Sequence, residues 1–401
     1  MDLTLIVVLV IALALFFDFT NGFHDTANAM ATPIATGALR PKVAVGLAAA
    51  LNLVGAFLST EVAKTISGGI INEGDGGVLI TPELIFAGLI GAIVWNMITW
   101  LLGLPSSSSH ALFGGLIGAA IVGAGLGAID FGVVVSKVIL PALLAPITAG
   151  LIAYVATKLA YAITRRYDGK PDGRDGFRYA QIFSSSLVAL AHGTNDAQKT
   201  MGVITLTLVA AGLQTAGTDV QWWVIVTCAI AIALGTYMGG WRIIKTLGTG
   251  LTDVKPAQGF AAETATAATI LASSHVGFAL STTQVASGSV IGSGLGRRGS
   301  KVRWKTAGRI GIGWLMTLPA AGAVGALAAL VAHLGVIGII IDAVVGTIVI
   351  AGIFVWSRRS EVSHHNVISE VADSGRAVKI KRNPKPKKKA KKADTGGKAP
   401  A

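Results

Sequence analysis

Two short segments place an aspartate inside long apolar stretches of the chain. Residues 21–28 read NGFHDTAN and residues 192–199 read HGTNDAQK, and in each a glycine stands three residues before the aspartate, Asp25 or Asp196. An ionised carboxylate at the centre of a bilayer costs about 2.5–3.5 kcal/mol on insertion scales, and it persists where it faces a wet cavity and binds something. We therefore interpret both aspartates as parts of a binding site.

Helix capping is an alternative role for the same two aspartates. Asp25 would cap a half-helix that starts at Thr26, and Asp196 would cap one that starts at Ala197. The two roles are compatible, because discontinuous helices form the binding sites of many transporters. The sequence therefore predicts an interrupted helix at each motif.

Two clusters of hydroxyl side chains precede glycine-rich apolar runs, in LPSSSSHALFGGLIG (104–118) and FALSTTQVASGSVIG (278–292). Hydroxyls and free backbone N–H groups at a helix start direct donors toward an anion. One cluster on each side would hold a tetrahedral oxyanion, whereas N-capping and contacts between helices are the structural alternative. The candidate binding residues of these clusters are Ser107, Ser108, Ser109, Ser281, Thr282 and Thr283.

Further ionisable side chains in apolar segments are candidates for the coupling ion. Glu263 lies in FAAETATAATI, and Lys199 follows Asp196 by three residues, where the first motif has Asn28. Lys199 would pair with the bound anion or simply neutralise Asp196. Free histidine titrates near neutral pH, so His24, His110 and His192 are either proton carriers or hydrogen-bonded structural residues. Asp342 is left without a role.

Composition fixes the class of the protein. The 401 residues have a mean hydropathy of +0.67 and only 13% charged side chains, against about 25% in soluble domains. Several apolar runs reach the length of about 20 residues that crosses a bilayer, and the single Cys228 excludes an internal disulfide framework. The chain is predicted to be an all-α polytopic membrane protein with broken or re-entrant helices and about 10–12 transmembrane segments. The expected spans are 4–40 (interrupted), 42–60, 83–104, 111–129, 132–162, 181–215 (interrupted), 222–241, 257–280, 284–296, 306–334 and 335–357.

Charge sorts the connecting loops into two groups. Five connecting or terminal segments carry Lys and Arg, including the tail 375–401 with eleven basic residues and one acid, whereas 65–82 and 214–220 carry none. The positive-inside rule then places the N-terminus outside and the C-terminal tail in the cytoplasm of a cell-membrane protein. The tail composition predicts disorder. The tail is either a solvated segment that only sets the topology or a segment attracted to anionic lipid on the cytoplasmic face.

The two pairs of motifs recur at nearly the same spacing. The offset from Asp25 to Asp196 and the offset from Ser107 to Ser281 differ by only three positions. The expected spans carry the two copies in opposite directions, which indicates an inverted-topology repeat, an architecture of secondary transporters. Chance matching of short serine and glycine strings is the alternative, and the shared offset disfavours it. The predicted domains are a first repeat (1–164), a basic cytoplasmic linker (165–180), a second, inverted repeat (181–357) and the basic tail (358–401).

The repeated Gly-x-Asn-Asp-x-x-Asn pattern and the paired hydroxyl clusters resemble the inorganic phosphate transporter (Pit) family. GFHDTAN and HGTNDAQK are most similar to its bacterial, low-affinity branch. The resemblance covers about residues 4–357 and implies symport of inorganic phosphate through an inverted-repeat fold. It implies substrate-binding roles for Asp25, Asn28, Ser107, Ser108, Ser109, Asn195, Asp196, Ser281, Thr282 and Thr283, and it matches Glu263 to an acidic residue of the second repeat.

Three positions depart from the sodium-coupled members of that family. His24 stands where they have Asn, Lys199 where they have a second Asn, and Asn52 where they have Glu. A fixed ammonium near Asp196 takes the electrostatic place of a bound cation, and the loss of oxygen ligands disfavours sodium. We therefore predict proton coupling, with a coupling-ion set of His24, Asp25, Asp196, Lys199 and Glu263.

The expected mechanism is alternating access, in which phosphate binds between the repeats and a proton on a carboxylate or His reduces repulsion. A sodium-coupled phosphate symporter and a transporter of another oxyanion such as sulfate are the alternatives, and a membrane phosphatase is the weakest one. No enzymatic activity, cofactor or nucleic-acid partner is expected. Bacterial relatives are associated with metal–phosphate complexes, so a divalent metal bound to phosphate is a candidate cargo. The sequence leaves open whether the protein is a homo-oligomer and how many ions move with each phosphate.

Overall fold

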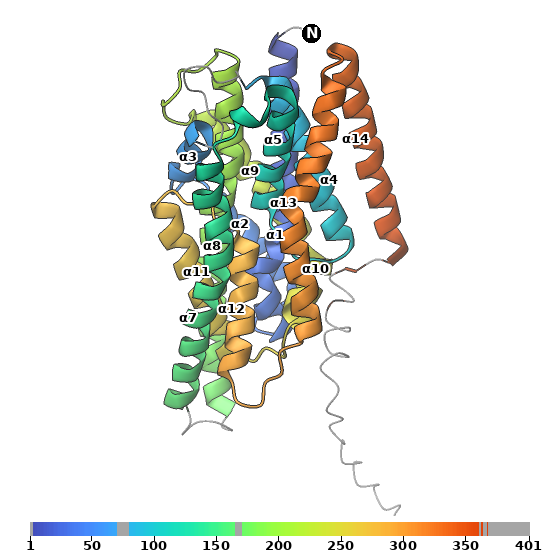
Figure 1. Ribbon diagram of the computed structural model, residues 1–401. Coiled ribbons are helices and arrows are strands. Elements are labelled where there is room, and N and C mark those ends of the chain that lie inside the picture. The colour runs from blue at the N-terminus through green and yellow to red at the C-terminus, as the bar shows by residue number, and fades with distance from the viewer. Residues whose placement is uncertain (1–2, 70–79, 165–170, 361, 364–366, 368–401) are drawn as a thin grey trace, which may run out of the picture.

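A computed structural model describes residues 3–69, 80–164, 171–360, 362–363 and 367. All regular elements among these residues are helices, and they form a bundle whose long members run roughly side by side (Figure 1). The tail 375–401 and residues 70–79 of the predicted outside loop (65–82) lie outside the described residues. The helices are α1 (Leu3–Ala35), α2 (Pro41–Gly55), α3 (Glu61–Gly69), α4 (Pro82–Leu101), α5 (Ser108–Ala124), η1 (Leu126–Ala128), α6 (Phe131–Val133), η2 (Val134–Ile139), α7 (Leu140–Thr164), α8 (Pro171–Ala210), α9 (Trp222–Met238), α10 (Trp241–Lys245), η3 (Thr246–Gly250), α11 (Pro256–His275), α12 (Thr282–Gly296), α13 (Trp304–Ala332), α14 (Val336–Ser357) and η4 (Arg358–Ser360).

Helix length and apolarity confirm the all-α polytopic membrane fold. Within the described ranges, five helices are long and apolar enough to cross a bilayer, and α9 with Trp241–Gly250 forms a sixth span that is bent by 60°. Shorter or more polar helices, such as α5 and α8, would bring the number to the predicted 10–12, and that number stays a prediction. Helix α8 begins at Pro171, which lies inside the segment predicted as a linker, 165–180.

The helices at both aspartate motifs are continuous, so the predicted interruptions are wrong. Helix α1 runs through Asp25 and helix α8 runs through Asp196 without a break, and neither Thr26 nor Ala197 begins a helix. The motif glycines serve helix packing instead. A Cβ atom on Gly22 would lie 2.3 Å from the carbonyl oxygen of Ile232 on α9. The glycines therefore allow two helix backbones to touch, and the polar side chains find their partners on neighbouring helices.

Two short helices do begin inside the bundle, as the hydroxyl clusters predict. Ser107 caps α5 by accepting a hydrogen bond from the His110 N–H (3.1 Å), and Ser281 caps α12 by accepting one from the Gln284 N–H (3.3 Å). Figure 1 places α5 in the upper half of the bundle and α12 in the lower half. The N-capping alternative is therefore correct for these two serines, and each cap fixes the start of a helix in the protein interior.

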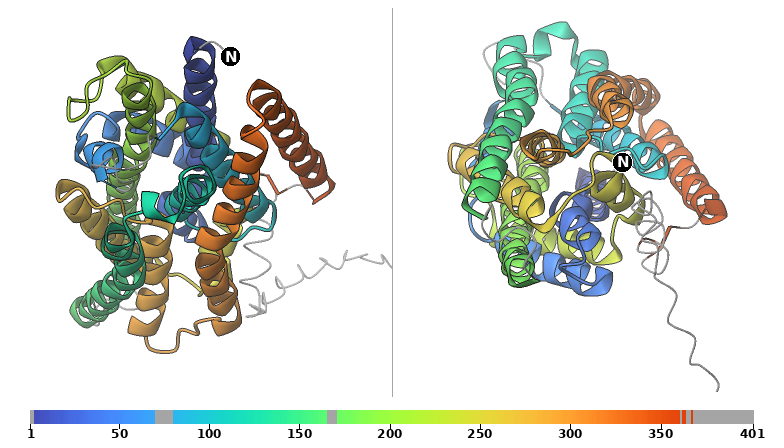
Figure 2. Two further views of the ribbon diagram at one scale, coloured as in Figure 1. Left: turned by 45° about the horizontal axis from the view of Figure 1, so that its top comes forward. Right: turned by 90° about the horizontal axis from the view of Figure 1, so that it is seen from below.

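The close helix contacts occur in matched pairs. Helix α1 packs on α9 and α8 packs on α2, while α5 packs on α13 and α12 packs on α7 (Figures 1 and 2). A Cβ atom on Gly118 of α5 would lie 2.0 Å from the Gly322 oxygen, and one on Gly292 of α12 would lie 1.9 Å from the Gly150 oxygen. Gly292 follows Gly118 at the same offset that separates the two capping serines, so the tight contacts recur with the motifs.

The segment that follows α5 is one long helical run with an irregular start. A π-helical stretch, Val134–Ile139, stands just before Pro141, and Pro146 lies inside α7. A proline lacks the N–H that would close the preceding helical turn, and the wider π turn accommodates this loss. The span predicted at 132–162 is therefore helical throughout, between Phe131 and Thr164.

The outer helices present apolar side chains away from the bundle. Ile163 on α7, Leu315 on α13 and Ile337 on α14 are 75%, 76% and 68% exposed. Such surfaces suit contact with lipid chains, since acyl tails are as apolar as leucine. The polar groups are instead concentrated at the centre, where α1, α8, α5 and α12 meet.

Candidate functional site

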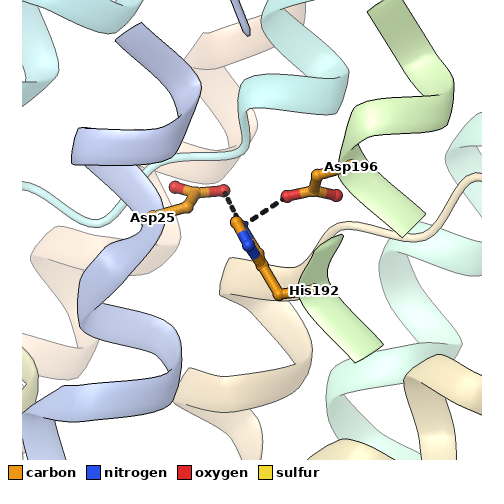
Figure 3. Close-up of side chains that lie close together, drawn as sticks. All are labelled: Asp25, His192 and Asp196. Carbon is orange, nitrogen blue, oxygen red and sulfur yellow. Dashed lines mark ion pairs between the residues drawn. The ribbon is translucent and has the colours of Figure 1, made fainter. Parts of the chain in front are cut away.

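The centre of the site joins the two predicted aspartates through a histidine. His192 lies one turn before Asp196 on α8, and its Nε2 atom is 2.8 Å from Asp196 Oδ2 and 3.8 Å from Asp25 Oδ2 on α1 (Figure 3). All three side chains are buried. Two helices that are far apart in sequence therefore converge on one imidazole, which contacts both carboxylates in the interior of the bundle.

A lysine provides the second cationic group of the centre. The ammonium of Lys199 donates to Asp196 Oδ1 and also to the backbone oxygen of Leu280, at 3.0 Å. The Lys199 side chain is fully buried. Asp196 thus lies between a fixed ammonium and His192, and the pairing of Lys199 with a carboxylate, which the sequence predicted as one of its roles, is confirmed.

The starts of the two short helices contact the aspartates directly. Ser108 on α5 donates to Asp25 Oδ2 at 3.1 Å, and Thr283 on α12 donates to Asp25 Oδ1 at 3.2 Å. Thr282 on α12 donates to Asp196 Oδ2 at 3.0 Å. The first N–H groups of a helix have no carbonyl partner within it, so these helix starts add backbone donors at the same place.

The asparagines of the motifs face different neighbours. Asn28 donates to Thr283 Oγ1 at 3.0 Å and to Thr282 Oγ1 at 3.3 Å, and so joins the centre. Asn195 instead donates to Ser274 Oγ on α11 at 2.9 Å. Ser109 bonds the backbone oxygen of Leu280 at 3.3 Å. The side chains of Ser107 and Ser281 accept from their own helices, as described above, and no contact between them and the aspartates is among the hydrogen bonds of the described residues.

His24 extends the centre toward α4. Its Nδ1 atom is 2.6 Å from Asp25 Oδ1, and its Nε2 atom is 3.3 Å from Thr99 Oγ1 and 3.4 Å from Ser106 Oγ. Ser106 in turn donates to Thr99 at 2.7 Å. His24, Thr99 and Ser106 thus form a polar chain that ends on Asp25, and protons can move along such a chain of hydrogen-bonding groups.

Glu263 belongs to a separate buried cluster. Its Oε1 atom accepts from Thr32 at 2.5 Å and from Gln181 at 3.0 Å, and its Oε2 atom accepts from Ser184 at 2.5 Å. The side chain is 2% exposed. The hydrogen-bond partners of Glu263 therefore come from α1 and α8, and they include none of the other predicted site residues.

Several residues of the centre are absent from the predicted set. His192 was considered only as one of three histidines, although it follows Asn21 at the same offset at which Asp196 follows Asp25, a signal that it belongs to the second motif. Asn52 contacts His192 Nδ1 at 3.3 Å and donates to Thr236 at 2.7 Å. Thr99 and Ser106 had no comparable signal, because isolated hydroxyl residues are common in apolar helices.

The arrangement suits a charged solute. Donor groups from two helix starts, an ammonium and an imidazole surround two carboxylates in an environment that excludes bulk water. Asp25, His192 and Asp196 each offer a ligand atom within 4.8 Å of the others, so together they could hold a metal ion. The fold and this centre define a polytopic helical membrane protein with a buried cluster of charged and hydroxyl side chains at its centre.

Comparison with known proteins identifies the family. Residues 21–325 match the phosphate transporter family. A relative from Mycobacterium bovis, named a probable low-affinity inorganic phosphate transporter, is 56% identical over 371 residues, which cover 92% of this chain and 88% of the relative. A relative of the same name from Bacillus subtilis is 42% identical over 328 residues, which cover 81% of this chain and 96% of the relative.

A solved structure supports the same fold. The structure titled "The sodium-dependent phosphate transporter" matches with a TM-score of 0.72 at 24% identity, and the match covers 82% of this chain and 100% of that chain. The chain therefore belongs to the phosphate transporter family, which confirms the family resemblance of its motifs. The family and these relatives are named as transporters, in agreement with the prediction that the chain is not an enzyme.

Proposed function

We propose that this chain carries inorganic phosphate across the cell membrane as a secondary active symporter coupled to protons. One observation carries the proposal: Asp25 and Asp196 meet at His192 where the starts of α5 and α12 present hydroxyl donors. A tetrahedral oxyanion needs hydrogen-bond donors from several sides, and the hydroxyls of α5 and α12 supply donors from two sides of this centre. Membership of the phosphate transporter family supports phosphate as the oxyanion.

Phosphate is favoured over sulfate by the carboxylates. Sulfate is fully ionised near neutral pH, whereas phosphate can donate a proton to an acceptor such as Asp25. A site rejects an analogue that leaves its polar groups unpaired. Ser108, Thr282 and Thr283, which now donate to the carboxylates, would turn to the phosphate oxygens.

Charge balance supports a proton as the coupling ion. Lys199 already neutralises part of the charge at Asp196, and the bound anion adds negative charge beside Asp25. A proton held by His192 between the two carboxylates would reduce that repulsion. Asn52, which contacts His192, offers an amide where a sodium site would gain more from a carboxylate. A divalent metal bound to the phosphate, held by Asp25, His192 and Asp196, is cargo that the same centre fits.

The repeated geometry supports an inverted repeat and alternating access. Each of the four helices that carry a motif packs on a helix from the other half of the chain: α1 on α9, α8 on α2, α5 on α13 and α12 on α7. We infer that residues 1–164 and 181–357 form the two repeats, and that relative motion of the two opens the site to each side in turn. In this orientation the N-terminus lies outside the cell.

Radiolabelled phosphate uptake into proteoliposomes tests the proposal. A proton gradient and a sodium gradient are imposed separately, with unlabelled sulfate as competitor. The expected result is uptake driven by the proton gradient alone and unaffected by sulfate. Uptake that requires sodium would keep phosphate transport and discard proton coupling, whereas sulfate uptake without phosphate uptake would discard phosphate as the substrate.

A further inference from the structure

A second group of buried polar side chains lies beside the central site and has no partner there. Every side-chain oxygen and nitrogen of Asp18, Asn21 and Asn96, together with the hydroxyl of Thr200, lacks a hydrogen bond to any described residue. These side chains are at most 1% exposed. Native proteins pair the great majority of buried polar atoms, and an unpaired buried carboxylate is especially costly. A bound ion, with ordered water, would satisfy this group.

Helix geometry places these residues next to one another. Asp18 and Asn21 are three residues apart on α1, so they are neighbours on one helix surface. Thr200 on α8 lies close to the Asp18 carboxylate, without a hydrogen bond of normal geometry. His24 on α1 contacts Thr99 on α4. Asn21 lies one turn before His24, and Asn96 lies one turn before Thr99. The contact therefore brings the turns that carry the two asparagines close together.

The group lies on one side of the central site. Asp18 is seven residues before Asp25, which is two helical turns or about 10 Å along α1 on nearly the same face. Thr200 is one turn beyond Asp196 on α8, which runs in the opposite direction. Both shifts lead toward the N-terminal end of α1, the end that the basic loops predict to face outside.

We propose that Asp18, Asn21, Asn96 and Thr200 form an outer cation site that precedes the central site and holds either sodium or a proton bound to the Asp18 carboxylate. Carboxylate, amide and hydroxyl oxygens are the ligands that hard cations take. An anion would instead face the carboxylates of Asp18 and Asp196. This site deepens the proposed cation coupling and rests on it for its role in transport.

Other charged and titratable groups set the strength of the site. Asp196, His192 and Lys199 approach Asp18 from α8, and the thiol of Cys228 approaches it from α9. The negative charge of Asp196 attracts a cation at Asp18, whereas the Lys199 ammonium weakens that attraction. Because Lys199 is paired with Asp196, its effect on the outer site is reduced.

Direct cation binding to the purified full-length chain, without phosphate, tests the site. Equilibrium binding of radiolabelled sodium in choline buffer forms one arm, and the infrared carbonyl band of a protonated carboxyl forms the other. Asp18→Asn is expected to weaken sodium binding by about tenfold or more, since affinity follows the number of charged ligands, or else to remove a carboxyl band that the wild-type protein shows. Asp219→Asn removes a carboxylate that is 87% exposed, in the loop before α9; it is the control and should change neither.

Thr200 provides an independent variant should Asp18→Asn fail to fold. Thr200→Val keeps the shape but removes the oxygen and should weaken cation binding, whereas Thr200→Ser should preserve it. Wild-type behaviour of Asp18→Asn and Thr200→Val in both arms would overturn the outer site. Loss of cation binding in these variants would support the outer site even if the wild-type protein carried no phosphate. Binding and uptake are measured separately, so a failure of the proposed transport function can be told apart from a failure of the outer site.

Discussion

His192 places its Nε2 atom 2.8 Å from Asp196 on its own helix and 3.8 Å from Asp25 on another. One imidazole thus contacts both motif aspartates, although α1 and α8 lie far apart in the sequence. A proton on this imidazole would be shared by two carboxylates, and its loss would leave them facing one another in the protein interior. In the proposed mechanism, protonation of His192 is the step that couples a proton to phosphate binding.

Replacement of His192 tests this link. We expect His192→Gln to abolish uptake driven by a proton gradient, because the amide cannot carry a proton between the carboxylates. Initial rates of uptake from pH 5.5 to 8.5 would measure the effect, and His333→Gln, at the exposed end of α13, is the control. A His192→Gln protein with the pH profile of wild type would exclude His192 as the proton carrier.

Asp196 is expected to be indispensable. Asp196→Asn should abolish phosphate uptake, and it leaves the Lys199 ammonium buried without its carboxylate, a change that costs about 3–5 kcal/mol in comparable buried pairs. The double variant Asp196→Asn with Lys199→Met removes both charges and should restore the melting temperature without restoring uptake. Uptake at the wild-type rate by either variant, measured in proteoliposomes with equal protein content, would remove Asp196 from the site.

Lys199 and Asn52 determine which cation is used in our proposal. Lys199→Asn copies the residue at the matching position of the first motif, Asn28, and Asn52→Glu adds a carboxylate. The double variant should gain uptake that increases with sodium by about tenfold, since added oxygen ligands and charge raise affinity for hard cations. Sodium titration of the uptake rate would measure this gain. Uptake that stays independent of sodium would show that these positions do not select the cation.

The glycine contacts of α5 and α12 should contribute to stability at matched positions. Gly118→Ala and Gly292→Ala each place a Cβ within about 2 Å of a backbone oxygen, and overpacking of this kind costs about 1–3 kcal/mol. Both variants should lower the melting temperature in detergent. Gly311→Ala on α13, where a Cβ meets nothing within 4 Å, is the control and should not lower it. Equal melting temperatures for all three variants would contradict the tight packing of α5 and α12.

Much of the fold could be predicted, because apolar length and motif spacing are local properties of the sequence. The starts of α5 and α12 followed from serine caps ahead of glycine-rich runs. The continuity of α1 and α8 could not be predicted. A glycine three residues before an aspartate in an apolar segment suggests a helix break unless the facing helix is known. Gly22 is needed for the approach of α9, a contact with a helix in the other half of the chain.

Candidate site residues could be predicted where both motifs carry a counterpart, and could not where only one does. Asp25, Asp196 and the hydroxyl clusters stood out through their matching offsets. Asp18 has alanine at the corresponding position, Ala189, so the repeat gave no indication of it. Glu263 was correctly recognised as unusual, but its distance from the aspartates depends on how α11 packs against α8, which no local pattern encodes.

The glycine-lined contacts of the two short helices have a consequence for energetics. Backbone touches backbone where α5 meets α13 and where α12 meets α7, so each short helix is closely packed on one partner. A solute held by Ser108 and Thr282 at once would tie the two pairs together, and its binding energy would be greatest when both helix starts meet. Occupancy and arrangement would then be thermodynamically linked: loading favours the closed arrangement, and the closed arrangement raises affinity by the same factor.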